Sequence, residues 1–134
     1  MISHVMVGTN DLERAKAFYA ELLSVFGAQP AFASERGAMF AGPSGPPMLG
    51  VTVPFDGEAA TVGNGTMVSL RCESPAQVRT LYEKAMSLGA TSEGEPGPRG
   101  DQGQFYGAYF RDRDGNKLAG FAMNTAEEAG NADA

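Results

Sequence analysis

Apolar residues repeat at two different periods along the amino-terminal part of the chain. Residues 2–8 are a short apolar run whose period of two predicts a strand, with His4 and Met6 on one face. From Leu12 the apolar residues recur every three or four positions until Gly27, which predicts an amphipathic helix. Three further apolar pieces predict strands at residues 30–33, 38–41 and 48–53.

The same order of elements recurs after a glycine-rich stretch at residues 55–65. Residues 66–72 predict a strand, and Ser74-Pro75-Ala76-Gln77 is a capping box that predicts the start of a helix ending at Gly89. Later strands are expected near residues 90–92, at 105–111 and at 117–123, with a polar loop at 93–103. Residues 124–134 are small and acidic, and we expect them to be disordered.

The two halves of the chain align with each other. A shift of 63 positions places Phe18-Tyr19 on Leu81-Tyr82 and His4 opposite Met67. An internal duplication of a β-α-β-β-β unit explains this match. The sequence therefore predicts one domain over residues 1–123, with a first module at 1–54, a linker at 55–65 and a second module at 66–123.

Composition narrows the classes of function. Ten Lys and Arg residues against sixteen Asp and Glu residues give a net charge of −6, and the basic residues are scattered, so we expect no nucleic-acid partner. One His and one Cys allow neither a disulfide within the chain nor a Cys/His zinc cluster. Because no bilayer-length apolar run or signal-peptide pattern is seen, we expect a soluble, cytoplasmic protein with no membrane contact.

Two segments resemble the vicinal oxygen chelate superfamily, which includes glyoxalases, bleomycin-resistance proteins and extradiol dioxygenases. The first is Ile-x-His-Val-x-Val at residues 2–7, followed by Asn10-Asp11-Leu12-Glu13-Arg14-Ala15. The second is the hairpin sequence at residues 109–118, with Arg113 where proline is usual. The resemblance implies an α+β fold in which two βαβββ modules form a curved eight-stranded sheet, or cup, around a small-molecule cavity. It also implies a homodimer.

Metal-dependent members of that family place ligands on the first and fourth strands of each module. The resemblance puts His4 at the first of these positions, Met67 where histidine is frequent and Ala119 where an acid is usual. The remaining position lies in residues 48–53, which contain no carboxylate, His or Gln. A divalent ion normally needs three protein ligands, so we predict no divalent-metal cofactor, with His4 the only matching ligand position.

Alternation along the predicted strands selects the residues of a substrate pocket. These residues are His4, Met67, Ser69, Arg71, Tyr109 and Phe121. Arg71 is either a clamp for a carboxylate or phosphate or part of a salt bridge at the rim. His4 either contacts the ligand or forms a hydrogen bond inside the cup, and Tyr109 either donates to a substrate oxygen or stacks in the core. We expect Cys72 to be buried and not to act as a nucleophile.

Two functions remain open, and the sequence leaves undecided whether the protein is an enzyme. The first is a glyoxalase/bleomycin-resistance-like protein with lactoylglutathione-lyase-like or dioxygenase-like activity, which requires a metal site completed in some other way. The second is a metal-free protein that binds and sequesters a small hydrophobic or aromatic compound. The first is the leading hypothesis. The second is the alternative, and its sequence support is the absence of metal ligands together with the Met and aromatic side chains of the predicted pocket.

Overall fold

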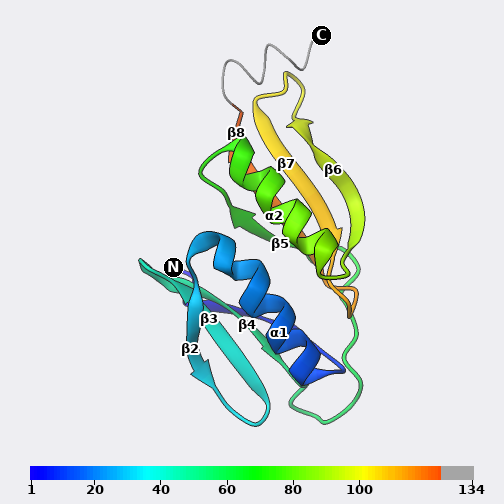
Figure 1. Cartoon of the computed structure of the whole chain (residues 1–134). Helices are drawn as coiled ribbons and strands as arrows, with labels where there is room; N and C mark the ends of the chain where they lie inside the picture. The colour runs from blue at the N-terminus through cyan, green and yellow to red at the C-terminus, as the bar shows by residue number, and fades with distance from the viewer. Residues whose placement is uncertain (125–134) are drawn as a thin grey trace. The chain divides into compact units, whose positions relative to one another are not determined.

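A computed structural model describes residues 1–124 of the protein. Contacts divide these residues into two units. The first unit contains Met1–Gly63 together with Asp114–Asn116, and the second contains Asn64–Arg113 and the segment that begins at Lys117. Each unit consists of one sheet and one principal helix (Figure 1).

The first unit has a four-stranded mixed sheet. Its elements are β1 (His4–Gly8), α1 (Leu12–Leu23), the short 3-10 helix η1 (Ser24–Phe26), β2 (Gln29–Ala33), β3 (Gly37–Gly42) and β4 (Gly45–Thr52). The strand order is β1-β4-β3-β2, with β1 parallel to β4 and the other pairs antiparallel. Helix α1 packs on β3 and β4.

Local sequence signals set the ends of α1. The Asp11 side chain accepts a hydrogen bond from the Arg14 backbone N–H, which satisfies one of the free donors of the first turn. Gly27, with φ of 71°, closes η1 in the left-handed region that glycine tolerates best. The buried side chains of α1 are Ala15, Phe18, Tyr19, Leu22 and Leu23.

The second unit repeats this arrangement. Its elements are β5 (Val68–Arg71), α2 (Pro75–Ser87), β6 (Thr91–Arg99), β7 (Phe105–Arg111) and β8 (Lys117–Met123). The strand order is β5-β8-β7-β6, and β5 runs parallel to β8. Ser74 caps α2 by accepting from the Gln77 N–H at 3.1 Å. The predicted α+β class and the repeated βαβββ order are confirmed.

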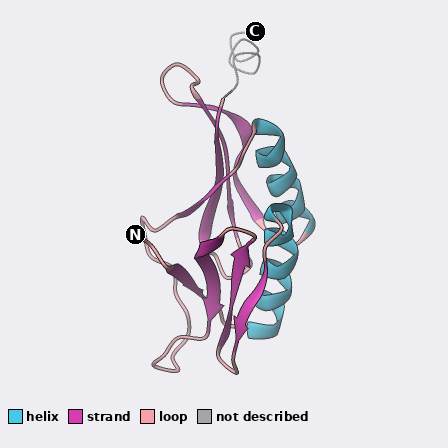
Figure 2. Cartoon of the chain, turned by 90° about the vertical axis from the view of Figure 1, so that its left-hand side faces the viewer, coloured by secondary structure: helices cyan, strands magenta, loops and turns pink. Residues whose placement is uncertain are grey.

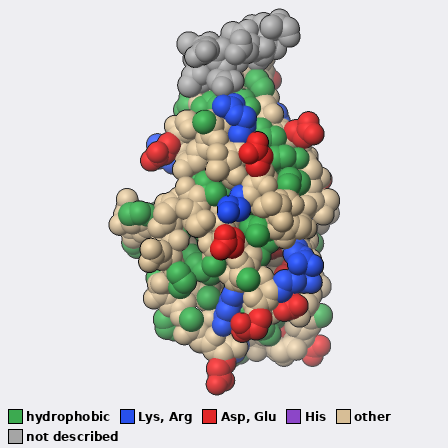
Figure 3. All heavy atoms as spheres, viewed as in Figure 1, with side chains coloured by type: hydrophobic (Ala, Val, Ile, Leu, Met, Phe, Trp, Pro, Cys, Tyr) green, Lys and Arg blue, Asp and Glu red, His purple; other side chains and the backbone are tan. Residues whose placement is uncertain are grey.

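In each unit the helix covers one face of its sheet and leaves the other face open (Figure 2). Val78, Leu81 and Ala85 of α2 are buried where the helix packs on β7 and β8, whose Phe110 and Leu118 are also fully buried. On the sides that carry the helices, acidic and basic side chains are interspersed (Figure 3). No helix within residues 1–124 is long and apolar enough to cross a membrane.

The structure differs from the sequence-based expectations in the bounds of two strands and in the arrangement of the sheets. Residues 93–99, predicted as loop, belong to the nine-residue strand β6, and β4 begins at Gly45 instead of Met48. Hydrogen bonds within residues 1–124 place the eight strands in two four-stranded sheets, one in each unit, where one curved eight-stranded sheet was expected. The predicted disordered tail lies outside the described residues except for Asn124, whose N–H donates to the Gln104 carbonyl.

Candidate functional site

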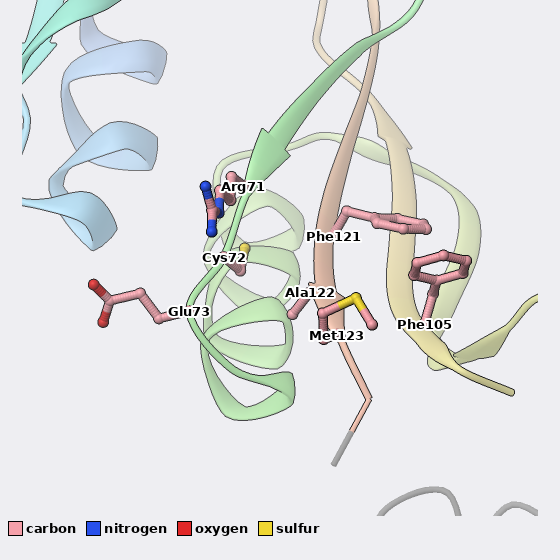
Figure 4. A pocket seen from close by; sticks show the side chains of 7 residues that line it. All are labelled: Arg71, Cys72, Glu73, Phe105, Phe121, Ala122 and Met123. Atoms are coloured by element: carbon pink, nitrogen blue, oxygen red, sulfur yellow. The ribbon is translucent and has the colours of Figure 1, made fainter.

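The second unit contains a pocket at the end of its sheet, with a volume of about 690 Å³. It lies where the parallel strands β5 and β8 both end. The lining residues are Arg71, Cys72, Glu73, Phe105, Phe121, Ala122 and Met123. Figure 4 shows the two phenylalanine rings on one flank, Arg71 and Glu73 on the other, and Ala122 and Met123 between them.

The register of the sheet brings the aromatic flank together. Phe105 lies opposite Met123, and Phe121 lies opposite Gly107. Because Gly107 has no side chain, the Phe121 ring can lie over it; a Cβ there would be 3.0 Å from the ring carbon Cδ2. The Phe105 and Phe121 ring centroids are 5.2 Å apart with an interplanar angle of 38°. Such a pair offers an apolar, π-rich wall to a ligand.

The opposite flank is polar. Arg71 pairs with Phe121 across β5 and β8, so its stem starts beside the aromatic wall. The guanidinium of Arg71 is exposed and forms no ion pair with any residue of the described part of the chain. The rim salt bridge considered for Arg71 is therefore not seen there. The five N–H donors of the Arg71 guanidinium suit a carboxylate or phosphate on a ligand.

Cys72 lies on the helix-facing side of the pocket and is 4% exposed. Burial raises the pKa of its thiol from the ordinary value of 9.0 to about 11, against the smaller lowering effect of a hydrogen bond with the Phe121 backbone. At neutral pH the sulfur is a protonated thiol and a poor nucleophile. The structure thus agrees with the expectation that Cys72 is a buried apolar group.

Five of the six predicted site residues share the open face of the second sheet. Ser69, Arg71 and Phe121 lie there with Tyr109, and Met67 directly precedes β5 on the same side. Among these, Arg71 and Phe121 line the pocket, whereas Met67, Ser69 and Tyr109 do not. The Tyr109 ring contacts the cations of Arg99 and Lys117, 5.4 and 5.5 Å from its centroid.

The sixth predicted residue, His4, belongs to the first unit and is exposed on the open face of its sheet. Its Nδ1 lies 2.7 Å from the Ser3 hydroxyl oxygen. Met48 is its partner on β4, and the next position on that face of β4 is Gly50. Among the described residues, the β4 side chain paired with His4 is therefore the thioether of Met48.

The positions that the family resemblance assigns to metal ligands do not fit a divalent ion. Ala119 is fully buried and ends in a methyl group, and Met67 is 44% exposed with only a thioether to offer. Within residues 1–124 no group of three or more His, Cys, Asp or Glu side chains comes together. Zinc, nickel, manganese and iron prefer imidazole, carboxylate or thiolate donors, so this donor set does not match them.

Sequence reasoning missed five of the lining residues, namely Cys72, Glu73, Phe105, Ala122 and Met123. Phe105 and Met123 could have been predicted as neighbours from the sequence, because the β7–β8 pairing is symmetric about Asp114 in the turn. Counting outward from Asp114 pairs Arg111 with Lys117 and Phe105 with Met123. Glu73 lies beyond the end of β5, in the turn that leads to α2, where alternation gives no guidance.

The paired modules define a class of protein, and comparison with known proteins identifies the family. The family model of the glyoxalase/bleomycin resistance protein/dioxygenase superfamily matches residues 1–119. The chain belongs to this superfamily. A comparison with the curated proteins finds none that matches.

Solved structures share the fold. A glyoxalase/bleomycin resistance protein from Albidiferax ferrireducens T118 is 39% identical, with a TM-score of 0.82 over 92% of this chain and 98% of that chain. Lactoylglutathione lyase from Agrobacterium tumefaciens is 21% identical, with a TM-score of 0.67 over 91% and 92% of the two chains. The fosfomycin resistance protein FosX from Listeria monocytogenes is 19% identical, with a TM-score of 0.69 over 96% and 97%. The last two likenesses are evidence for the fold alone.

Proposed function

We propose that the protein binds a small organic acid with an aromatic body, without a divalent metal, in the pocket at the end of the second sheet. The observation that carries the proposal is that the Arg71 guanidinium, which has no ion-pair partner within residues 1–124, and a phenylalanine pair line the same pocket of about 690 Å³. Pockets of this size suit small organic ligands. The proposal makes the chain a binding or sequestering member of its superfamily.

Each flank has a separate part in recognition. The Phe105 and Phe121 rings take the aromatic body, and Met123, 66% exposed, adapts to its outline. Arg71 takes the acid group through charge-assisted hydrogen bonds. Glu73, on the flank of Arg71, offers acceptor oxygens to a hydroxyl or amino group of the ligand.

A lyase or dioxygenase reaction has weaker support. In the superfamily that chemistry depends on a metal that polarises an oxygenated substrate. The donors for such a metal are replaced here by Ala119 and Met67. Bound nickel or zinc at one equivalent, with turnover of a thiohemiacetal substrate, would contradict the proposal.

The test compares aromatic carboxylic acids with their uncharged primary amides by thermal shift and calorimetry, in the presence of EDTA. Naphthoate, cinnamate and phenylacetate serve as probes. We expect the acids to stabilise the protein more than the amides do. Arg71→Gln should remove this preference, because the charged partner of the acid is lost.

The matched control is Arg113→Gln, which removes the same charge from an exposed arginine in the β7–β8 turn, at the other end of those strands. It should leave the preference for acids intact. Equal loss in both variants would show that general charge, and not the pocket, attracts the acids. If no acid stabilises the unaltered protein, the proposed function is wrong.

A further inference from the structure

Three of the seven methionines gather on the open face of the first sheet, beside the only histidine of the chain. Met6 on β1, Gly50 on β4 and Met39 on β3 form one cross-strand row. His4 and Met48 form the neighbouring row, two residues along β1 and β4. We call His4, Met6, Met39 and Met48 the methionine cluster.

Gly50 lets the thioether side chains converge. A Cβ built at Gly50 would lie 2.5 Å from the Met6 sulfur and 2.7 Å from Cγ of Met39. Both side chains therefore bend over the same glycine. Adjacent strands lie about 4.8 Å apart and alternate residues about 6.6 Å apart, distances that long methionine side chains can bridge.

The cluster is open on the side away from α1. Met6 is 40% exposed and His4 is exposed, whereas Val7, Leu49 and Val51, at alternate positions of β1 and β4, are buried on the helix side. An ion can therefore reach the sulfurs and the imidazole from solvent.

The hydrogen bond at His4 leaves a suitable nitrogen for an ion. Nδ1 of His4 lies 2.7 Å from the Ser3 hydroxyl oxygen, and Nε2 has no hydrogen-bond partner in the described part of the chain. A hydrogen bond to one ring nitrogen orients the other toward a metal. Because His4 and Met48 are register partners on β1 and β4, Nε2 and a thioether can serve one ion.

We infer that the methionine cluster is a binding site for a soft monovalent cation, Cu(I) or Ag(I). Thioether sulfur is a soft donor that selects Cu(I) over harder ions, and imidazole also binds copper. None of the four donors is a carboxylate or a thiolate, which suits a singly charged ion better than a divalent one. This site lies within the first unit and shares no residue with the pocket of the second unit.

The test titrates the full chain with Ag(I) by calorimetry in chloride-free buffer, and with Cu(I) by anaerobic competition against bicinchoninate. A Cys72→Ala background removes the one thiol that would compete for soft ions. We expect one ion per chain. Met6→Leu, Met39→Leu and Met48→Leu conserve size, so the fold is kept, which circular dichroism checks.

Each of these substitutions should weaken binding by more than about tenfold, since even outer partners of a metal contribute on the order of 10–100-fold to affinity. Ser3→Ala should weaken it by about tenfold for the same reason. The matched control is Met67→Leu, which removes an exposed methionine of the second unit and should leave the affinity unchanged.

A direct readout is the methyl NMR spectrum of methionine-labelled protein. On addition of Ag(I), the methyl signals of Met6, Met39 and Met48 and the ring signals of His4 should shift together, and the Met67 signal should not. Less than one ion per chain, equal weakening by Met67→Leu, or shifts confined to other methionines would each overturn the inference. The aromatic-acid experiment is independent, so either idea can fail alone.

Discussion

The Thr9 hydroxyl donates a 2.6 Å hydrogen bond to Oδ2 of Asp114, 105 positions further along the chain. The other carboxylate oxygen of Asp114 accepts from the Asn10 backbone N–H at 2.9 Å. Two residues on, the Asn116 side chain donates to the Gly8 carbonyl at 2.8 Å. The tip of the β7–β8 hairpin is thereby bonded to the turn between β1 and α1, which explains why Asp114–Asn116 belong to the first unit.

Asp114→Ala should lower the free energy of unfolding by about 1.5–3 kcal/mol, because it leaves the Thr9 hydroxyl and Asn10 N–H without a charged acceptor. Thr9 is 1% exposed, so water does not easily replace that acceptor. Urea denaturation measures the effect. In a double-mutant cycle with Thr9→Val the coupling energy should be about 0.5–3 kcal/mol.

The control for this prediction is Asp101→Ala, at an exposed aspartate between β6 and β7. Its effect should stay within about 0.5 kcal/mol. A midpoint for Asp114→Ala that equals that of Asp101→Ala would show that the hairpin tip contributes nothing to stability.

The hairpin illustrates what the sequence could and could not reveal. Turn residues at 112–116 predict a hairpin because turn chemistry is local. The partners of Asp114 lie more than a hundred positions away, and no local rule reaches them. The strand expected near residues 90–92 is the start of β6, and the rest of β6 was predicted as loop for a related reason. Its segment Gly-Glu-Pro-Gly-Pro-Arg has poor strand propensity, and pairing with β7, through two register shifts, overrides that propensity.

The candidate site, too, was predictable from the sequence only where a local pattern determines it. Alternation along β5 placed Ser69 and Arg71 on the open face, and the period of two made that placement secure. The pocket also depends on where neighbouring strands end, which requires the register between β5 and β8. Tyr109 lies on the open face through its pairing with Ala119, whereas Tyr106 is 6% exposed beside α2.

Gly120→Ala should lower the free energy of unfolding by about 1–3 kcal/mol, because a methyl group there overpacks the contact between β8 and α2. A Cβ at Gly120 would be 2.7 Å from Cδ2 of Leu81 and 3.5 Å from the Cys72 sulfur. Thermal and urea denaturation measure the change. Gly42→Ala is the matched control, since nothing lies within 4 Å of its Cβ position. It should be neutral or stabilise by up to about 1 kcal/mol, and equal losses at both positions would contradict the packing argument.

The stability of the protein should fall between pH 9 and pH 11 because of Cys72. Its pKa is raised from 9.0 to about 11 by burial, so the folded chain keeps the proton in this range while the unfolded chain loses it. The unfolded state then binds fewer protons, and the free energy of unfolding decreases by up to about 1.4 kcal/mol per pH unit. Below pH 9 the thiol is protonated in both the folded and the unfolded chain, so the stability that the buried thiol contributes is fully present.

Denaturant titrations at pH 8, 9, 10 and 11 on the unaltered chain and on Cys72→Ala isolate the effect. The difference in stability between the two proteins should shrink as the pH rises. At pH 8 the Cys72 thiol of the folded protein should also react with a disulfide reagent at least about a hundredfold more slowly than free cysteine, because its thiolate fraction is small. A constant difference across this range, or reaction at the free-cysteine rate, would refute the account of Cys72.

Removing the hydroxyl should matter at Tyr106 and not at Tyr109. The Tyr106 oxygen accepts a hydrogen bond from Nη1 of Arg79 at 3.1 Å, and the guanidinium carbon lies 5.5 Å from the ring centroid. Tyr106→Phe keeps the ring and loses this bond beside α2, so the free energy of unfolding should fall by about 0.5–1.5 kcal/mol. Tyr109 interacts through its ring, with Arg99 and Lys117, and Tyr109→Phe keeps those contacts. Its effect should be within about 0.5 kcal/mol. Urea denaturation of both variants measures the two changes in the free energy of unfolding. A larger decrease for Tyr109→Phe than for Tyr106→Phe would contradict the placement of Tyr109 on the open face and of Tyr106 on the helix face.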